Sequence, residues 1–194
     1  MQETLTDYQA AINWAKELLK RDHFCILDTE TTGLSNIDEI CQIALVNSSG
    51  EPLLNSLVRP TVSISAAASE IHGITDKFVT DAPKFEAVFL ELLRALGNRD
   101  LVIYNSEFDT RFIRQSLKAH GIQLAFAMSE RRGCRIFTNG GSIHCCMTWY
   151  SQFVGDWNNY HGNYKWQRLP GGDHSALGDC KATLAVIRQM AAAE

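Results

Sequence analysis

Two carboxylates stand two residues apart in the segment Asp28-Thr29-Glu30, directly after an apolar run. In a β-strand, residues two apart project from the same face, so both carboxylates can aim at one position just beyond the sheet edge. That geometry suits a hard cation. The spacing alone is weak evidence, because chance gives about 0.6 such tripeptides in a chain with this many acidic residues.

Two further acids lie where helices are expected to begin. Asp109 falls in the first turns of one such helix, where a negative charge also serves simply to stabilise the helix dipole. Asp179 falls in the first turns of the last helix, and His174 precedes it by five residues, which on a helix is about 140° away. We therefore place His174 in a loop, which Gly171 and Gly172 would allow to move.

The elements that must position these residues follow from an alternation of helical and strand periods, which predicts an α/β fold. Strands are expected over 23–28, 40–46, 53–58, 101–104 and 142–146, the first three as an antiparallel meander with a turn over 31–36. Helices are expected over 6–20, 85–96, 105–120, 147–155 and 175–190. Together they give a mixed five-stranded sheet flanked by helices.

Composition narrows the class of protein. A chain of 194 residues with 45% hydrophobic content can bury one core, and 13 Gly and 4 Pro exclude a disordered or collagen-like chain. No window is apolar enough to span a membrane, and the first 22 residues lack a signal-peptide core, so a cytoplasmic protein is expected. A net charge of −4 excludes attraction of the whole molecule to nucleic acid, but it agrees with carboxylates gathered to hold metal ions.

The six cysteines are scattered through apolar segments without C-x-x-C spacing, and we interpret them as reduced thiols. A zinc site formed by His144, Cys145 and Cys146 is the alternative for part of this set. It is disfavoured because adjacent strand residues point to opposite faces.

Four stretches carry a family resemblance. FCILDTETTGL, IHGIT, IYNSEFDTRFI and HSALGDC occur in this order over roughly residues 24–190. In order, spacing and neighbouring apolar residues they resemble the DEDDh family of 3′-to-5′ exonucleases, which includes bacterial proofreading subunits, RNase T and oligoribonuclease. The resemblance implies a ribonuclease H-like fold and a single exonuclease domain over residues 1–194, with 1–22 as an N-terminal helical extension and 23–192 as the catalytic core.

The resemblance also implies a catalytic set. It assigns four metal ligands and a general base, in that order Asp28, Glu30, Asp109, Asp179 and His174. An all-carboxylate set selects Mg²⁺ or Mn²⁺ over zinc. Two such ions would activate a water and neutralise the leaving 3′ oxygen, while a histidine accepts the water's proton at neutral pH.

Substrate contacts are implied in the same way. Backbone N–H groups of Thr31, Thr32 and Gly33 would lie near the terminal nucleotide, and Leu34, His72 and Phe108 near the terminal bases. For each of these residues a purely structural role is equally open.

Aromatic residues cluster over 149–166. Trp149, Phe153 and Trp157 repeat every four residues and are predicted to be core, whereas Tyr160, Tyr164 and Trp166 are the better candidates for stacking on single-stranded bases. The densest basic group is Arg131, Arg132 and Arg135, which would contact phosphates or form a solvated turn.

The chain departs from many family members in two places. Only residues 170–173 separate Leu169 from His174, where relatives place a further helix, and this leaves the breadth of substrates open. The sequence ends at Glu194 without the tail by which proofreading subunits attach to a polymerase, so we predict a stand-alone exonuclease.

The predicted reaction is 3′-to-5′ hydrolysis of single-stranded DNA ends to nucleoside 5′-monophosphates. An RNA exonuclease like RNase T or oligoribonuclease is the alternative, since no residue here decides how a 2′-hydroxyl is read. A nucleic-acid-binding module without turnover is the third possibility.

Overall fold

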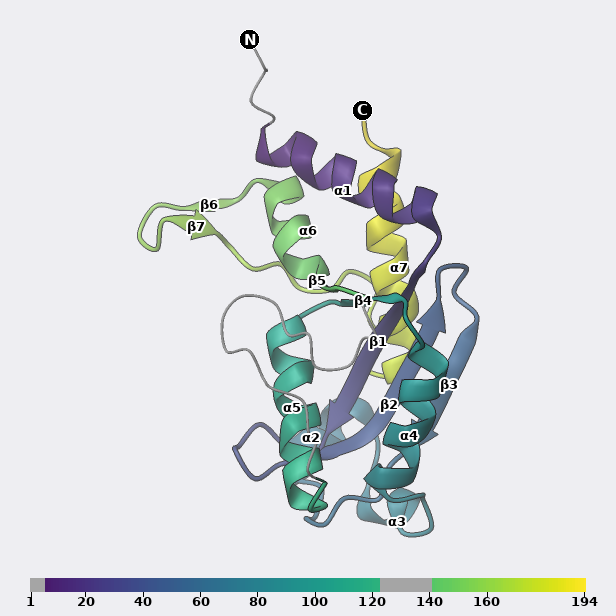
Figure 1. The fold of residues 1–194 in the computed structure, drawn as a ribbon. Helices are drawn as coiled ribbons and strands as arrows, with labels where there is room; N and C mark the ends of the chain where they lie inside the picture. Colours follow the sequence, from purple (N-terminus) through teal and green to yellow (C-terminus); the bar gives the residue numbers. More distant parts are fainter. Residues whose placement is uncertain (1–5, 123–140) are drawn as a thin grey trace.

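The computed structural model of the protein describes residues 6–122 and 141–194. Its centre is a five-stranded sheet in the order β3-β2-β1-β4-β5 (Figure 1). β1 (Phe24–Thr31), β2 (Ile40–Asn47) and β3 (Pro52–Leu57) form an antiparallel meander. β4 (Asp100–Ile103) lies parallel to β1, and β5 (Ile143–Cys145) lies parallel to β4. The predicted mixed five-stranded sheet is confirmed.

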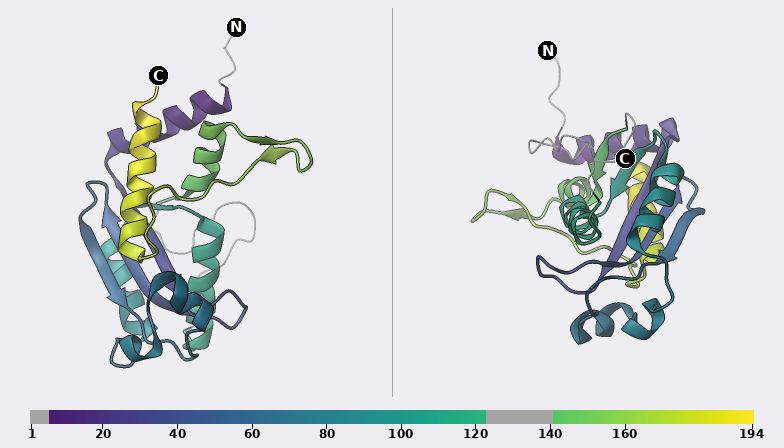
Figure 2. Two further views of the ribbon diagram at one scale, coloured as in Figure 1. Left: turned by 180° about the vertical axis from the view of Figure 1, so that it is seen from behind. Right: turned by 60° about the horizontal axis from the view of Figure 1, so that its bottom comes forward.

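Helices cover both faces of the sheet (Figure 2). On one face lie α1 (Asp7–Arg21), α6 (Cys146–Val154) and α7 (Ala176–Ala192), and on the other α4 (Phe85–Leu96) and α5 (Ser106–Ala119). Side chains of β1 alternate between the two cores, with Ile26 packed on the α7 side and Leu27 on the α4 and α5 side. Among the described helices, none combines the length and apolarity needed to cross a bilayer.

The N-terminal helix is part of this core. Thr6 is its N-cap, and the Thr6 hydroxyl accepts a hydrogen bond from the Gln9 backbone N–H, as the sequence predicts. Ala11, Ala15 and Leu18 on its inner face are buried in the cluster that also contains α7 residues. α1 is therefore packed onto the body of the molecule.

Three short elements were not predicted. α2 (Ala66–His72) and α3 (Asp76–Val79) follow β3. A hairpin of β6 (Trp157–Asn158) and β7 (Asn163–Tyr164), which comes between α6 and α7 in the chain, projects from the body beside α6 (Figure 1). β1 also ends three residues later than expected, because it stays paired with β2 as far as Thr31. The expected turn at residue 31 therefore begins one residue later.

The aromatic segment is only partly core. Trp149 and Phe153 pack against the α1 and α7 cluster, as predicted. The prediction for Trp157 is wrong, because α6 ends at Val154, Gly155 takes a φ of +76°, and Trp157 lies on β6 with 47% of its surface exposed. The basic group Arg131, Arg132 and Arg135 lies outside the described residues.

Candidate active site

The C-terminal half of β1 is paired on one side only. β1 pairs with β2 as far as Thr31, but with β4 only over residues 24–27. The chain leaves β4 after Ile103 and begins α5 at Ser106, so an opening forms beside β1 from Asp28 onward. Open α/β sheets commonly hold ligands beyond the carboxyl ends of their strands.

Asp28 and Glu30 occupy the positions of β1 that face α7. Phe24 and Ile26 pack in the cluster that contains α7 residues, and strand alternation carries that direction forward to both carboxylates. Asp179 approaches from the first turn of α7. One carboxylate oxygen from each of the three acids lies within 4.8 Å of the other two. The pair in the strand thus gains a third carboxylate from the end of the chain.

Asp109 reaches the same opening from α5, on the opposite face of the sheet. Only 3% of its surface is exposed. The Thr29 hydroxyl donates a hydrogen bond to Asp109 Oδ1 at 2.8 Å, which is possible because Thr29 alternates with Asp28 and faces α5. Because Asp109 is buried and hydrogen-bonded to β1, stabilisation of the helix dipole from the surface does not account for its position.

Burial and neighbouring charges raise the pKa values of Asp28, Glu30 and Asp109. Burial, followed by the charges of Asp109, Glu30 and Asp179, raises the pKa of Asp28 well above its usual range. Burial and the charges of Asp179 and Asp109 raise the pKa of Glu30 to about 8. Burial raises the pKa of Asp109 to about 7, although the Thr29 hydrogen bond acts in the opposite direction. A cation among these groups would relieve their repulsion.

His174 lies in the loop before α7, as predicted, with a φ of +59°. This left-handed conformation is costly for a residue with a side chain, so the surroundings must hold it. Asp179 Oδ1 accepts hydrogen bonds from the backbone N–H groups of Asp173 at 2.9 Å and His174 at 3.3 Å. Asp173 Oδ1 in turn accepts from the backbone N–H and the hydroxyl of Ser175, at 3.0 and 2.7 Å. The loop is thereby tied to one carboxylate of the cluster.

Two glycines leave room for these contacts. A Cβ on Gly178 would overlap the carboxylate of Asp173, and a Cβ on Gly172 would lie 2.9 Å from Asp179 Oδ1. Gly172 and Gly178 are therefore required for close approach of these carboxylates.

A hollow of about 240 Å³ opens over the cluster. All four candidate ligands and His174 line it, together with Thr29, Tyr104, Asn105, Phe108 and Leu169. The Tyr104 hydroxyl donates a hydrogen bond to the Gln167 carbonyl at 2.9 Å, which ties the segment leading to His174 to the end of β4. The structure thus gathers the whole predicted catalytic set around one space.

A second hollow of about 430 Å³ adjoins the first, and Thr29, Glu30 and Phe108 line both. Five of the six predicted substrate residues line this second hollow: Thr31, Gly33, Leu34, His72 and Phe108. Thr32 does not, because it is buried, with its N–H donating to the Glu39 carbonyl and its hydroxyl to Asp38.

The ring of His72 is held on both nitrogens. Nδ1 accepts a hydrogen bond from the Ile74 N–H at 3.0 Å, so Nε2 carries the proton and donates it to the Thr31 carbonyl at 3.1 Å. The ring therefore fastens α2 to the end of β1. His72 has a structural role in addition to its place in the wall of the second hollow.

Sequence reasoning missed Thr29, Tyr104 and Asp173. The spacing from Asp173 to Ser175 is that of an Asx turn and could have indicated the loop-holding contact. Thr29 meets Asp109 across 80 residues, and Tyr104 meets Gln167 across 63, so no local pattern could have shown either contact.

The alternative zinc site does not form. Trp14 Nε1 donates to His144 Nδ1 at 3.4 Å, and His144 Nε2 lies 3.7 Å from the Asp100 carboxylate. Within residues 6–122 and 141–194, the cluster with metal-ligating geometry is Asp28, Glu30 and Asp179. The five cysteines of these ranges are free thiols.

Comparison with known proteins places this chain in a family. A family model described as an exonuclease of the RNase T type matches residues 25–187. The chain belongs to this exonuclease family. The exonuclease is 38% identical over 188 residues to the uncharacterized exonuclease CP81 of Escherichia phage 186, and the match covers 91% of this chain and 92% of that protein.

Two further relatives extend the comparison. DNA polymerase III subunit epsilon of Buchnera aphidicola subsp. Baizongia pistaciae is 35% identical over 109 residues, covering 50% of this chain and 44% of that protein. The solved structure of Exonuclease X in complex with 5′ overhanging duplex DNA matches with a TM-score of 0.55 and 26% identity, covering 88% of this chain and 94% of that one. The ribonuclease H-like fold and the DEDDh family are confirmed, and the protein is an enzyme, an exonuclease that acts on nucleic acid.

Proposed function

We propose that this exonuclease degrades single-stranded DNA from the 3′ end, releases nucleoside 5′-monophosphates and uses two divalent cations. The observation that carries the proposal is the convergence of four carboxylates and His174 on one hollow beside a second, mainly apolar one. Strand and helix ends from four parts of the chain meet there.

The carboxylate cluster fits Mg²⁺ or Mn²⁺. Its donors are all oxygens, and one oxygen from each of Asp28, Glu30 and Asp179 lies within 4.8 Å of the other two. Burial and neighbouring carboxylates raise the pKa values of Glu30 and Asp109, so a cation here would stabilise their charged forms. We assign Asp28, Glu30 and Asp179 to one ion, and Asp28 with Asp109 to the second. When bound, such ions activate a water and stabilise the charge that builds up on the phosphate and on the leaving 3′ oxygen.

His174 is proposed as the general base. Its side chain is exposed on the loop and lines the hollow over the cluster, so an attacking water can reach the imidazole. An imidazole accepts and releases protons near neutral pH, as this step requires. Asp179 and Asp173 hold the backbone of the loop, which restricts where the ring can move.

The second hollow is proposed to hold the terminal nucleoside. Leu34, Ile71 and Phe108 offer apolar surface for a base, while Glu30 and Thr29 connect this hollow to the cluster. DNA is favoured as substrate because the named relatives include a DNA polymerase subunit and an enzyme bound to duplex DNA with a 5′ overhang. Such an overhang leaves a recessed 3′ end, so duplex substrates belong in the test.

We also propose that residues 1–194 form one catalytic domain, as the match to the phage relative over 91% of this chain and 92% of that protein supports. The five cysteines within residues 6–122 and 141–194 are free thiols, four of them buried, which favours a reducing compartment such as the cytoplasm.

Oligonucleotides labelled at either end test the proposal. With Mg²⁺ or Mn²⁺, a 3′-labelled single-stranded DNA should release labelled mononucleotide at once, and a 5′-labelled one should give a ladder of shortened strands. EDTA should stop both. RNA and duplex DNA of the same sequence serve as comparisons. If RNA were cleaved faster than DNA, RNA would be the preferred substrate. Release of the 5′ label first would contradict the proposed polarity.

A further inference from the structure

A third hollow, of about 270 Å³, adjoins the hollow over the carboxylate cluster. Its lining residues are Asn105, Glu107, Phe108, Arg111 and Trp166. Asn105 and Phe108 also line the hollow over the cluster, so the two spaces are neighbours. We call the third space the α5 groove, because four of its five lining residues lie on α5 or at its N-cap.

Trp166 forms the wall of the α5 groove that does not come from α5. Its surface is 70% exposed, and within residues 6–122 and 141–194 its ring contacts no other aromatic ring. The other described tryptophans differ, since Trp14 and Trp149 stack on each other and Trp157 meets Tyr164 edge to face. The flat face of the Trp166 indole is therefore available to a ligand.

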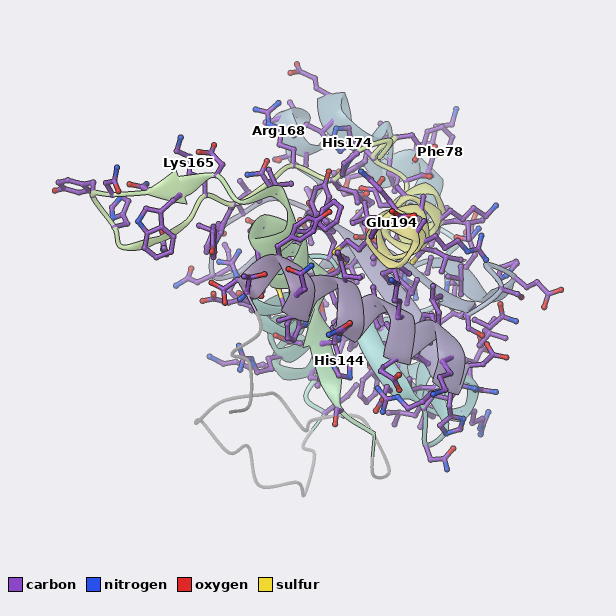
Figure 3. All side chains as sticks on the ribbon, turned by 90° about the horizontal axis from the view of Figure 1, so that it is seen from above. Phe78, His144, Lys165, Arg168, His174 and Glu194 are labelled. Atoms are coloured by element: carbon purple, nitrogen blue, oxygen red, sulfur yellow. The ribbon has the colours of Figure 1, made fainter. Side chains whose placement is uncertain are left out.

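The backbone next to Trp166 is fixed in place. The neighbouring Gln167 carbonyl accepts the Tyr104 hydroxyl, which joins this part of the chain to the end of β4. The labelled side chains of Lys165, Arg168 and His174 mark the path from the hairpin to the start of α7 (Figure 3). Trp166 lies on that path between Lys165 and Arg168, so its indole is part of a segment that leads directly to the proposed base.

Arg111 provides a positive charge on the opposite wall. Its guanidinium carbon lies 4.4 Å from the centre of the Phe112 ring and 5.5 Å from that of Phe108, and Nη1 donates to the Leu34 carbonyl at 3.5 Å. In the described part of the chain, no carboxylate forms an ion pair with it. The remaining N–H groups of this oriented guanidinium are free for a phosphate.

We propose that the α5 groove binds an internal nucleotide of the single-stranded substrate, with the base stacked on Trp166 and its phosphate at Arg111. The inference rests on the proposed function, because the strand must run from the carboxylate cluster into a neighbouring space. The second hollow holds the terminal nucleoside, which leaves the α5 groove for the strand upstream of the cleaved bond. Glu107 also lines the groove, and its charge directs the phosphate toward the Arg111 side.

This arrangement selects an unpaired strand. A base in a duplex stacks on its neighbours along the strand, whereas an unpaired base can lay one face on an indole. Such stacking contributes about 1–3 kcal/mol per base and tolerates any sequence. The groove therefore favours single-stranded ends without selecting a base.

The test uses the full chain and a single-stranded DNA decamer whose 3′-terminal linkage is a phosphorothioate, to slow cleavage during the binding measurement. In Mg²⁺, Trp166→Ala should raise the Kd of the decamer roughly 5- to 150-fold, the equivalent of the loss of one stacked base. Trp166→Phe should recover most of this affinity. Trp157→Ala is the matched control, an exposed tryptophan on the nearby hairpin, and its Kd should stay within about twofold of the parent's.

A second readout separates this groove from the catalytic site. The p-nitrophenyl ester of thymidine 5′-monophosphate carries no upstream nucleotide, so Trp166→Ala should hydrolyse it at the parent's rate. Arg111→Gln should lower the dependence of log Kd on log salt concentration by about one phosphate contact. Intrinsic fluorescence should be quenched when the decamer binds the parent, and less so in Trp166→Phe.

The outcomes are distinguishable. If Trp166→Ala binds the decamer as tightly as the parent does, the inference is wrong while the exonuclease assignment stands. If Trp166→Ala lowered the rate of ester hydrolysis by the same factor as it weakened decamer binding, Trp166 would act through the catalytic loop. That result would also overturn the inference. If the parent binds the decamer but hydrolyses neither the ester nor an unmodified decamer of the same sequence, the proposed function fails and the groove is retained as a binding site.

Discussion

Oδ1 of Asp179 accepts a hydrogen bond from the backbone N–H of His174 at 3.3 Å. The same side chain contributes to the carboxylate cluster. One carboxylate therefore serves both the proposed metal site and the loop that carries the proposed base. This coupling explains how a histidine with a positive φ is kept at the rim of the hollow.

Replacement of His174 should reduce the chemical step more than binding. His174→Ala is expected to lower the single-turnover rate by about 10²- to 10⁴-fold, because it removes the proton acceptor while the four carboxylates remain. His174→Asn should behave alike, since asparagine tolerates the left-handed backbone and loop strain is then not the cause. His161→Ala, an exposed histidine in the hairpin turn, is the control.

Oligonucleotide affinity separates the two roles of His174. The Kd of both variants should remain within about threefold of the parent's. Weaker binding with an unchanged single-turnover rate would show that His174 positions substrate and that the base lies elsewhere.

Gly178→Ala should disturb the loop without removing a ligand. Its Cβ would overlap the Asp173 carboxylate and displace it from Ser175, which frees the backbone at His174. We expect turnover to fall about tenfold or more, with Mn²⁺ affinity little changed. Lys181→Ala on the exposed side of α7 is the control.

A double-mutant cycle checks this cause. If the overlap with Asp173 is responsible, Gly178→Ala should add little to the loss already caused by Asp173→Ala. Additive losses would show that Gly178 acts through some other contact.

Stability should depend on pH and on divalent cations together. The folded-state pKa values of Glu30 and Asp109, about 8 and about 7, lie above those of the unfolded chain. At any pH between a group's unfolded and folded pKa values, the native state therefore binds more protons than the unfolded state does. In EDTA the free energy of unfolding should therefore fall as pH rises from about 4.5 to 8, and acidification should restore it. Urea titrations across this range measure the slope.

Saturating Mn²⁺ should remove this slope, because it neutralises the carboxylates in the native state. At a concentration of about 100 Kd it should add about 2.7 kcal/mol, or roughly 5–10 °C in Tm. A Tm at pH 8 that does not respond to millimolar Mn²⁺ would contradict a preformed carboxylate site.

The sequence was sufficient for the parts of the fold with strong local patterns. The periodicity of residues 85–96 and of 175–190 predicted α4 and α7, and the Thr6 cap predicted where α1 begins. The placement of Asp28 and Glu30 on one face followed from strand alternation alone. The roles of the remaining site residues came from the family motifs.

Other features depend on tertiary contacts that leave no local pattern. α2 buries only Ala68, so its amphipathic signal is too weak to predict a helix. The four-residue repeat that includes Trp157 continues past Gly155, yet the helix ends there and the chain turns into the hairpin. The backbone N–H of Thr32 donates to the Glu39 carbonyl, a contact that forms only when the turn between them has folded.

The most direct test of the account is mononucleotide release from 3′-labelled single-stranded DNA by the parent and by Asp28→Asn in saturating Mg²⁺. Asp28 is the best residue to replace, because the charges of Asp109, Glu30 and Asp179 all raise its pKa and it is assigned to both ions. We expect the parent to release mononucleotide and Asp28→Asn to lose roughly a thousandfold or more of this rate. Its fold should be unchanged by circular dichroism, and its Tm in EDTA should be at least as high as the parent's. Asp81→Asn, at an exposed position, should match the parent. A folded Asp28→Asn that releases mononucleotide within tenfold of the parent's rate would contradict the account.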